Sequence, residues 1–311
     1  MATIDVSISV VHYRDFNLTR KCLDSVFSKT KGISFQVIVV DNHSPDSENL
    51  RRRYGKKIKL IVNAINKGFA AANNQALKIV VGRYFLMLNP DTFLTYNAIG
   101  IMVKLMDRHS DWGVCCPQLL NLDGSRQKSY SDFKTPFQRA MWEISSPATK
   151  LGLMKDNVRK KESFPKNVTE VHRPRGTCYL IKRECIEQIG PLDEKFYMYG
   201  EEVDWSMRAK SYGWKNMFVP SAKVFHIGGA NTTQPIYRQV QQYSEYYYYD
   251  KHYRGYASWL IRLFAVFGLF LWLVVAVKYR QTKLLSNAQI SLINALASSW
   301  LIDWKSLKHG N

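Results

Sequence analysis

The first ninety residues alternate between apolar, β-branched runs and helical patterns, and this alternation constrains the fold more than any other feature. The predicted strands are residues 6–11, 35–40, 58–62 and 84–88, and the predicted helices between them are residues 18–27, 47–54 and 68–80. Strands separated by helices pair in parallel, in a sheet covered on both faces. The sequence therefore predicts an α/β fold with a mostly parallel sheet.

Polar residues follow each of the four predicted strands. The four clusters are His12-Tyr13, Asp41-Asn42-His43-Ser44, residues 63–66 and Asn89-Pro90-Asp91-Thr92. Turns are often polar, but the carboxyl ends of parallel strands meet at one edge of a sheet, where α/β proteins bind ligands. Four clusters at successive strand ends favour a binding site.

The next part of the chain is less regular. Residues 117–170 lose clear periodicity and carry many polar and basic residues, which indicates an inserted, partly helical region over a second substrate site. Residues 177–181 and 219–225 predict further strands, and residues 203–212 a helix.

Composition limits the class of partner. The 311 residues are 46% hydrophobic and 22% charged, which is typical of a folded core. Lysine and arginine outnumber aspartate and glutamate by 44 to 25, giving +19, so nucleic acid, anionic lipid or a phosphorylated substrate is expected as a partner. No nucleic-acid module is recognisable. Five cysteines without CxxC spacing suit buried, reduced thiols, and the first residues resemble no signal peptide, so a cytoplasmic catalytic part is expected.

The C-terminal segment has the composition of a membrane-associating region. Residues 243–256 hold seven tyrosines, and Trp259 and the fifteen-residue apolar run 263–277 follow. Tyrosine and tryptophan gather at membrane interfaces, whereas a spanning helix needs about 20 apolar residues. The sequence favours a helix in the interface, or a re-entrant hairpin completed by residues 290–304, over a buried core helix or an oligomer contact.

Three carboxylates lie within four residues of this basic chain, in Gly200-Glu201-Glu202-Val203-Asp204. They fall where a helix begins, so they either complement the helix dipole or handle a proton or cation. Asp204 and Arg208 are four residues apart and can pair, which makes Asp204 the most structural of the three. Glu201 and Glu202 remain candidates for a general base.

Other residues suggest how a substrate phosphate is held. Asp91 is a suitable ligand for a hard divalent ion if a diphosphate and another side chain, such as His226, complete the set. Asp41 is placed to accept hydrogen bonds from a base or ribose. Gly68, at the start of a helix, allows close backbone approach to a phosphate. The chain has no P-loop and no GxGxxG motif, which disfavours kinases and dinucleotide oxidoreductases.

Five segments together resemble the family-two inverting glycosyltransferases of GT-A fold, in particular the bacterial rhamnosyltransferase-like branch. They are VIVVDNHS (37–44), NKGFAAANN (66–74), LNPDT (88–92), GPLDEKFYMYGEEVDWSMRAKSYGW (190–214) and VFHIGG (224–229). The resemblance implies a catalytic domain over residues 1–240, with a nucleotide-sugar half (1–116) and an acceptor half (117–240). Residues 241–311 follow as membrane-associating helices.

The resemblance also implies roles for single residues. Glu202 takes the position of the catalytic base, with Glu201 beside it, and Asp91 and His226 hold Mg²⁺ or Mn²⁺. The implied substrate-binding residues are His12, Asp41, Asn66, Gly68, Asn89, Arg175 and Asp204. Two positions depart from the family's usual aspartates. Asn89 leaves fewer charges to hold the metal, and Glu202, one methylene longer than aspartate, leaves Glu201 and Asp204 as rival bases.

The expected function is metal-dependent, inverting transfer of a sugar from a nucleotide-diphospho-sugar, with dTDP-rhamnose favoured. The expected acceptor is a lipid-linked or polymeric cell-surface glycan at the cytoplasmic face of the membrane. The alternatives are a basic binding protein for nucleic acid or membrane, and an inactive scaffold of the same fold.

Overall fold

The computed structural model describes residues 4–154, 164–228, 235–253, 255–280, 292 and 304–309. The chain divides into two compact units that interleave along the sequence. Unit 1 comprises residues 1–132, 164–230 and 304–311, and unit 2 comprises residues 133–163 and 231–303. The functional division into residues 1–240 and 241–311 stays a prediction.

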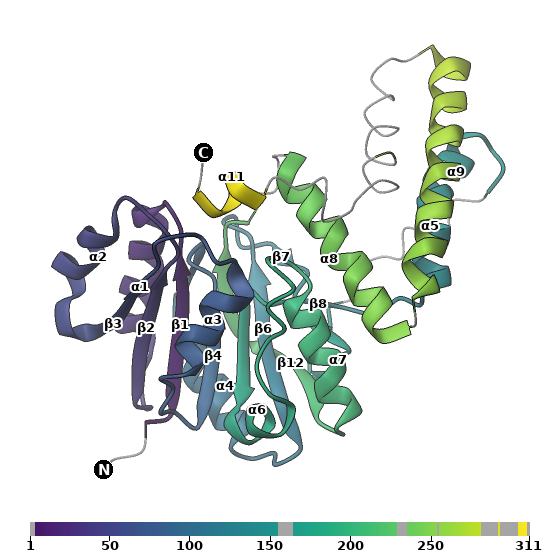
Figure 1. Ribbon diagram of the computed structural model, residues 1–311. Coiled ribbons are helices and arrows are strands. Elements are labelled where there is room, and N and C mark those ends of the chain that lie inside the picture. The colour runs from purple at the N-terminus through teal and green to yellow at the C-terminus, as the bar shows by residue number, and fades with distance from the viewer. Residues whose placement is uncertain are drawn as a thin grey trace. The chain divides into compact units, whose positions relative to one another are not determined.

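Unit 1 is built on a mixed sheet whose first half is parallel, as predicted (Figure 1). The parallel strands are β1 (Val6–His12), β2 (Phe35–Asp41), β3 (Ile58–Val62) and β4 (Tyr84–Leu88), in the spatial order β3-β2-β1-β4. All seven residues of β1 are buried, as expected for a parallel strand covered on both faces. The register places His12 opposite Asp41, so the polar residues that follow β1 and β2 lie at the same edge.

The second half of the sheet departs from the parallel pattern. Strand β11 (Cys178–Lys182) runs antiparallel to both β4 and β6 (Trp112–Leu120), whereas β12 (Lys215–His226) is parallel to β6. The short strands are β5 (Thr92–Phe93), β7 (Arg126–Gln127) and β9 (Thr169–Glu170) on the main sheet, and the pair β8 (Tyr130–Ser131) and β10 (Arg173–Pro174). Strand β6 was not foreseen from its sequence.

Helices cover both faces of the sheet, because alternate strand residues enter two cores. Val37 and Val39 join the core under α1 (Phe16–Lys29), α2 (Ser47–Tyr54) and α4 (Ala98–Met106). Ile38 and Val40 join the core under α3 (Phe69–Leu77), α6 (Arg183–Ile189) and α7 (Glu201–Ser211). A short 3₁₀ turn, η1 (Gly55–Lys57), follows α2. Each fully buried valine or isoleucine stabilises the fold by about 1.5–3 kcal/mol.

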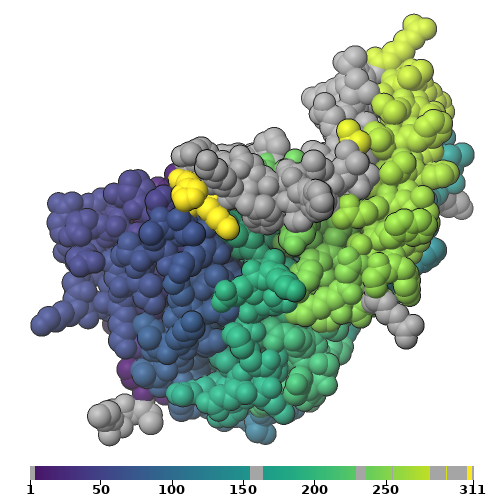
Figure 2. Space-filling model, viewed as in Figure 1, coloured from purple at the N-terminus to yellow at the C-terminus, as the bar shows by residue number. Residues whose placement is uncertain are grey.

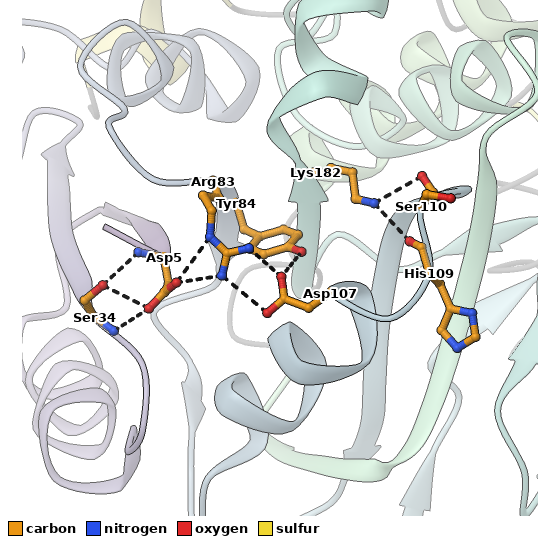
Figure 3. Close-up of polar contacts among 8 residues, drawn as sticks. All are labelled: Asp5, Ser34, Arg83, Tyr84, Asp107, His109, Ser110 and Lys182. Atoms are coloured by element: carbon orange, nitrogen blue, oxygen red, sulfur yellow. Dashed lines mark hydrogen bonds and ion pairs between the residues drawn. The ribbon is translucent and has the colours of Figure 1, made fainter. Parts of the chain in front are cut away.

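A charged network centred on Arg83, just before β4, fastens neighbouring elements together (Figure 3). The Arg83 guanidinium bonds Asp5 Oδ1 at 2.7 Å and also pairs with Asp107, which accepts a second hydrogen bond from Tyr84 Oη. Nearby, Lys182 Nζ donates to the carbonyl of His109 at 2.9 Å. The residues before β1 and β4 are thereby tied to the end of α4.

Unit 2 contains α5 (Pro136–Lys150), α8 (Pro235–Tyr253) and α9 (Tyr256–Tyr279). Helix α5 begins with a capping box formed by Thr135 and Gln138. Arg139, only 3% exposed, pairs with Glu143 and with Glu245 of α8, at 2.6 and 2.7 Å. Such buried pairs are costly to break, so they fix α5 against α8.

Helix α9 has two different faces. Ile261, Ala265 and Trp272 are buried, and α9 packs along α5. The opposite face is exposed and apolar, and its members are Trp259, Leu263, Val266, Phe267, Phe270, Leu273, Val274 and Val277. These follow the spacing of one helical stripe.

The 24 residues of α9 exceed the fifteen-residue run recognised in the sequence. Among the described residues, α9 is the helix whose length and composition would allow it to cross a membrane. Residues 290–304 were predicted to complete a hairpin, and all of them except Leu292 and Trp304 lie outside the described residues.

Candidate active site

Asp41 ends β2 and is completely buried. Its Oδ1 accepts a hydrogen bond from the Ser44 amide at 3.0 Å, whereas its buried Oδ2 has no hydrogen-bond partner among the described residues. Burial raises the pKa of Asp41 above its ordinary value. An unsatisfied buried carboxylate oxygen is costly, so this atom is suited to accept a hydrogen bond from a ligand.

The loop of residues 66–68 lies beside Asp41 and is held by Asn42. The Asn42 amide group donates to Asn66 Oδ1 at 2.6 Å and to the Gly68 carbonyl at 3.2 Å, and its oxygen accepts from the Lys67 amide. The amides of Gly68 and Phe69 are bonded to Asn66 Oδ1 and to the Tyr197 carbonyl. Because these amides are already hydrogen-bonded within the protein, the loop contributes to the shape of a ligand site more than it supplies hydrogen-bond donors.

Gly68 is required where this loop meets Tyr197. Its φ is +86°, and a Cβ at this position would lie 2.3 Å from the Tyr197 carbonyl oxygen. Only glycine combines that conformation with so close an approach. The sequence predicted close backbone approach at Gly68 to a phosphate; within the chain, the close neighbour is Tyr197.

Asp91 directly precedes β5 and His226 is the last residue of β12, and the fold brings these two side chains together. Asp91 Oδ2 lies 3.3 Å from His226 Nε2, and His226 Nδ1 is 2.8 Å from Gln127 Oε1. Asp91 Oδ1 and Asn89 Oδ1 are buried and lack hydrogen-bond partners in the described ranges. These oxygens and the imidazole suit a divalent ion.

The described residues contain no group of three or more His, Cys, Asp or Glu side chains arranged to hold a metal. Asp91 and His226 therefore fit an ion that also takes oxygen ligands from a bound substrate.

The acidic stretch forms the first turn of α7, and its three carboxylates differ sharply. Glu201 is 5% exposed, its Oε2 has no partner in the described structure, and burial, then the Glu202 charge, raise its pKa well above 4.5. Glu202 is half-buried, and its stem packs against Gly176, where an added Cβ would lie 3.3 Å from Glu202 Cβ. Glu202 is thus the more accessible of the two.

Asp204 is fully buried and is bonded to Arg208, with 2.9 Å between Oδ2 and Nε. Arg208 also donates to the carbonyls of Ile189 and Pro191. The predicted pairing within α7 is confirmed, and it directs Asp204 toward the protein.

His12 and Arg175 occupy contrasting places. His12 is fully buried, and both ring nitrogens are engaged, with Thr19 Oγ1 and with Asp46 Oδ1, each at 2.8 Å. This geometry suits positioning of the strand-end loops more than direct substrate contact. Arg175 is exposed, and its amide donates to the Ser129 carbonyl.

Two connections join these parts into one site. The Asn89 amide donates to the Thr177 carbonyl at 2.9 Å, so the loop that packs on Glu202 is bonded to the NPD turn. On the other side, Tyr197 bonds the 66–68 loop and precedes α7 by four residues. Tyr197 and Gln127 were not predicted as site residues, although the tyrosine lies in the quoted motif of residues 190–214.

The backbone between Tyr197 and α7 is unusual. Tyr199, with φ +67°, and Gly200, with φ +94°, are both left-handed. Non-glycine residues avoid this region unless their surroundings enforce it, and such outliers cluster at functional sites. The turn sets the direction in which α7 presents Glu201 and Glu202.

The mixed sheet of unit 1 is the GT-A glycosyltransferase fold that the sequence predicted, because solved glycosyltransferases share it. Residues 7–190 match the glycosyl transferase family 2, and the chain belongs to that family. The resemblance found in the sequence is confirmed. The matched residues end before α7, so the family match does not include the acidic stretch of residues 201–204.

Curated relatives are glycosyltransferases at low identity. An N-acetylglucosaminyl-diphospho-decaprenol L-rhamnosyltransferase of Mycobacterium tuberculosis is 25% identical over 61% of this chain and 66% of its own length, just under two thirds. A low-salt glycan biosynthesis hexosyltransferase, Agl10, of Haloferax volcanii is 22% identical over 96% of this chain and 83% of its own.

Solved structures share the fold. A mannosyltransferase from Pyrobaculum calidifontis, in complex with GDP-Man and Mn²⁺, is similar with a TM-score of 0.60 at 14% identity, over 94% of this chain and 86% of that one. GalNAc-T7 with UDP, GalNAc and Mn²⁺ has a TM-score of 0.55 at 16% identity, over 80% and 50%. At these identities the likeness concerns the fold alone.

Proposed function

We propose that this chain transfers a sugar, with inversion, from a nucleotide-diphospho-sugar to a hydroxyl group of a lipid-linked or polymeric cell-surface glycan. The observation that carries the proposal is the connected set at the sheet edge. Asp41 offers an unsatisfied buried oxygen, Asp91 lies beside His226, and the NPD turn is bonded to the loop that packs on Glu202.

In this proposal the nucleoside binds at Asp41 and the diphosphate near Asp91 and His226. A divalent ion held by those two residues would stabilise negative charge on the departing diphosphate. Glu202 accepts the proton of the acceptor hydroxyl as the latter attacks the anomeric carbon from the face opposite the leaving group. Because one displacement occurs, the configuration of the sugar inverts.

Glu202 is favoured over its neighbours as the base because of accessibility. A general base must reach the proton that it removes. Asp204 is bound to Arg208, and Glu201 is almost fully buried, so each is turned from an incoming hydroxyl. Burial, then the neighbouring Glu202 charge, raises the pKa of Glu201, which favours the neutral form of Glu201.

The favoured donor is dTDP-L-rhamnose, since one relative is named as a rhamnosyltransferase that acts on a decaprenol-linked sugar. A location at the cytoplasmic face of the membrane is proposed with it. The one-sided apolar stripe of α9 supports a helix lying in the interface, because its opposite face packs on α5, which carries Arg139, Glu143 and Lys150.

The test is a donor screen that measures nucleotide-diphosphate release by the full chain with Mg²⁺ or Mn²⁺ and a lipid-linked acceptor. We expect one activated sugar to be turned over, and proton NMR of the product to show the inverted anomer. Turnover of no donor by the folded protein in lipid would refute the proposal and favour an inactive scaffold.

Substitution of Glu202 tests the mechanism. Glu202→Gln keeps the size of the side chain but cannot accept the proton, so kcat should fall by about 10²–10⁴-fold with little change in donor KM. Glu202→Asp is the matched control and should retain far more activity. Equal kcat values for Glu202→Gln and the wild type would exclude Glu202 as the base.

A further inference from the structure

The short helix α11 (Trp304–His309) belongs to unit 1, although α9 in unit 2 precedes it in the chain. Figure 2 shows α11 at the surface, against the N-terminal part of unit 1. The Leu307 side chain is only 5% exposed, whereas Lys308 and His309 are exposed. Among the described side chains of α11, Leu307 is therefore the apolar anchor, and the two residues after it are polar.

Backbone carbonyls of α11 bond directly to the site. The Lys308 carbonyl accepts from the Asn66 amide at 2.7 Å, and the Leu307 carbonyl accepts from Tyr197 Oη at 3.2 Å. The last carbonyls of a helix have no partner within the helix, so both bonds satisfy groups that would otherwise face water. The His309 ring also meets the His43 ring edge to face, with centroids 6.5 Å apart.

Tyr197 is the residue that joins α11 to the rest of the site. Its hydroxyl lies within 3.3 Å of the Asn66 carbonyl as well as the Leu307 carbonyl, and its own carbonyl accepts from the Phe69 amide at 2.7 Å. Its ring closes on Gly68. The 66–68 loop, the turn before α7 and α11 therefore meet at one side chain.

We propose that α11 forms a wall of the nucleotide-sugar site and that Tyr197 is the positioning residue that holds this wall against the 66–68 loop. The proposal rests on the proposed function, because it assigns the Asp41 edge to the nucleotide. Asn66 binds Asn42, the neighbour of Asp41, and His43 follows directly, so α11 touches both segments beside the unsatisfied oxygen of Asp41.

The chemistry of α11 matches an anionic ligand. Lys308 brings an exposed positive charge to this edge, where the diphosphate of a donor carries negative charge.

The first experiment needs no ligand. Hydrogen exchange of backbone amides is compared between the full chain and a variant that ends at residue 303. The Asn66 amide should exchange at least about tenfold faster in the truncated protein, because its partner is removed, while the Phe69 amide, bonded to Tyr197, should be unchanged. Equal Asn66 exchange in both proteins would overturn the docking of α11.

The second experiment measures the donor. Truncation at 303 and Leu307→Asp should each raise donor KM by about tenfold, the effect of losing one or two such hydrogen bonds, with kcat changed less than about threefold. Leu122→Asp, at a leucine that is 62% exposed, is the matched control. An unchanged KM, or a lower one as expected of an inhibitory segment, would overturn the proposal.

Tyr197→Phe distinguishes positioning from general stability, because it removes the hydroxyl and keeps the ring on Gly68. It should raise donor KM more in the full chain than in the truncated one, where the Leu307 carbonyl is gone and only the bond to the Asn66 carbonyl remains to be lost. Equal effects in both backgrounds would contradict the assigned role.

If the full chain turns over no donor, the proposed function fails separately. The affinities of the full chain and of the truncated chain for UDP and dTDP, measured by calorimetry, then test whether α11 forms a wall of the site. Weaker binding after truncation supports the proposal, and equal binding overturns it.

Discussion

At the residue scale, the site contains carboxyl groups with buried oxygens, although burial disfavours the charged form of a carboxyl group. Glu201 and Asp41 keep oxygens out of water without partners among the described residues, and Asp91 does the same beside His226. A fold selected for stability alone would satisfy these atoms. Asp41 and Asp91 follow the carboxyl ends of β2 and β4, and their unsatisfied oxygens are the strongest residue-level argument for a ligand there.

Glu201 provides a test of this burial through the pH dependence of stability. Its pKa is raised in the folded state, so above pH 4.5 the unfolded chain releases the proton first and the free energy of unfolding falls as pH rises. Glu201→Gln removes this penalty. The variant should be more stable than the wild type at pH 8, by about 1 kcal/mol or more, with the difference gone below pH 4.5.

The measurement is denaturant unfolding of both proteins between pH 4 and 8. Glu187→Gln is the control, because Glu187 is 63% exposed, and it should follow the wild type. A Glu201→Gln advantage that is the same at every pH would argue against a buried, protonated carboxyl.

At the element scale, the sequence predicted correctly those strands and helices that local residue patterns determine. The predicted strands 58–62 and 84–88 and the helix 47–54 have the observed bounds, and the i, i+4 pairing in α7 is confirmed. β6 was missed because its apolar run contains Pro117 and two cysteines and shows no alternation. Strand β11 was predicted at residues 177–181, but its antiparallel pairing with β4 and β6 depends on contacts far apart in sequence, which no local pattern encodes.

The Arg83 network allows an element-scale prediction (Figure 3). Burial would raise the pKa of Asp5, but hydrogen bonds from Arg83 and Ser34 outweigh it, and the Arg83 bond lowers the pKa of Asp107. Carboxyls with lowered pKa stabilise the fold above pH 3.8 and lose this contribution as pH falls through their folded pKa. Arg83→Met should thus destabilise the protein at pH 7, by about 1 kcal/mol for such partly exposed pairs.

The check is the free energy of unfolding between pH 7 and 2. The difference between Arg83→Met and the wild type should shrink below pH 4, as the carboxylates are protonated. Arg183→Met, which breaks the exposed pair with Glu187, is the matched control and should have a smaller effect. A difference that persists at pH 2 would mean that packing, not charge, explains it.

At the scale of the whole molecule, the proposed active site and the exposed apolar stripe of α9 are encoded in different stretches that alternate along the chain. Unit 1 carries the proposed active site, and unit 2 carries the apolar stripe of α9. The chain returns to unit 1 for α11. Helix α11 thus belongs to the same unit as the proposed active site, although it follows α9 in the chain.

The proposed membrane association predicts a separable loss of binding. Phe267→Glu with Phe270→Glu places two charges on the exposed stripe, where both rings are more than 60% exposed, so the core of unit 2 is unaffected. Sedimentation with anionic vesicles should fall by at least about tenfold, since burying each phenyl ring is worth about 1.5–3 kcal/mol. Activity toward a soluble acceptor should persist.

Leu122→Glu, at an exposed leucine in unit 1, controls for added charge. Undiminished vesicle binding by the double variant would show that the stripe faces another protein surface instead.

The sequence by itself determined the α/β class, the strand ends where polar residues gather and the family, because hydrophobic periodicity and ordered motifs are local properties. The tertiary structure decided which carboxylate is accessible, that both nitrogens of His12 are engaged inside the protein, and that α11 lies against Asn66. Those outcomes depend on burial and on hydrogen bonds between residues up to 242 positions apart, as between Asn66 and Lys308 (308 − 66). Only the folded chain brings such groups within bonding distance.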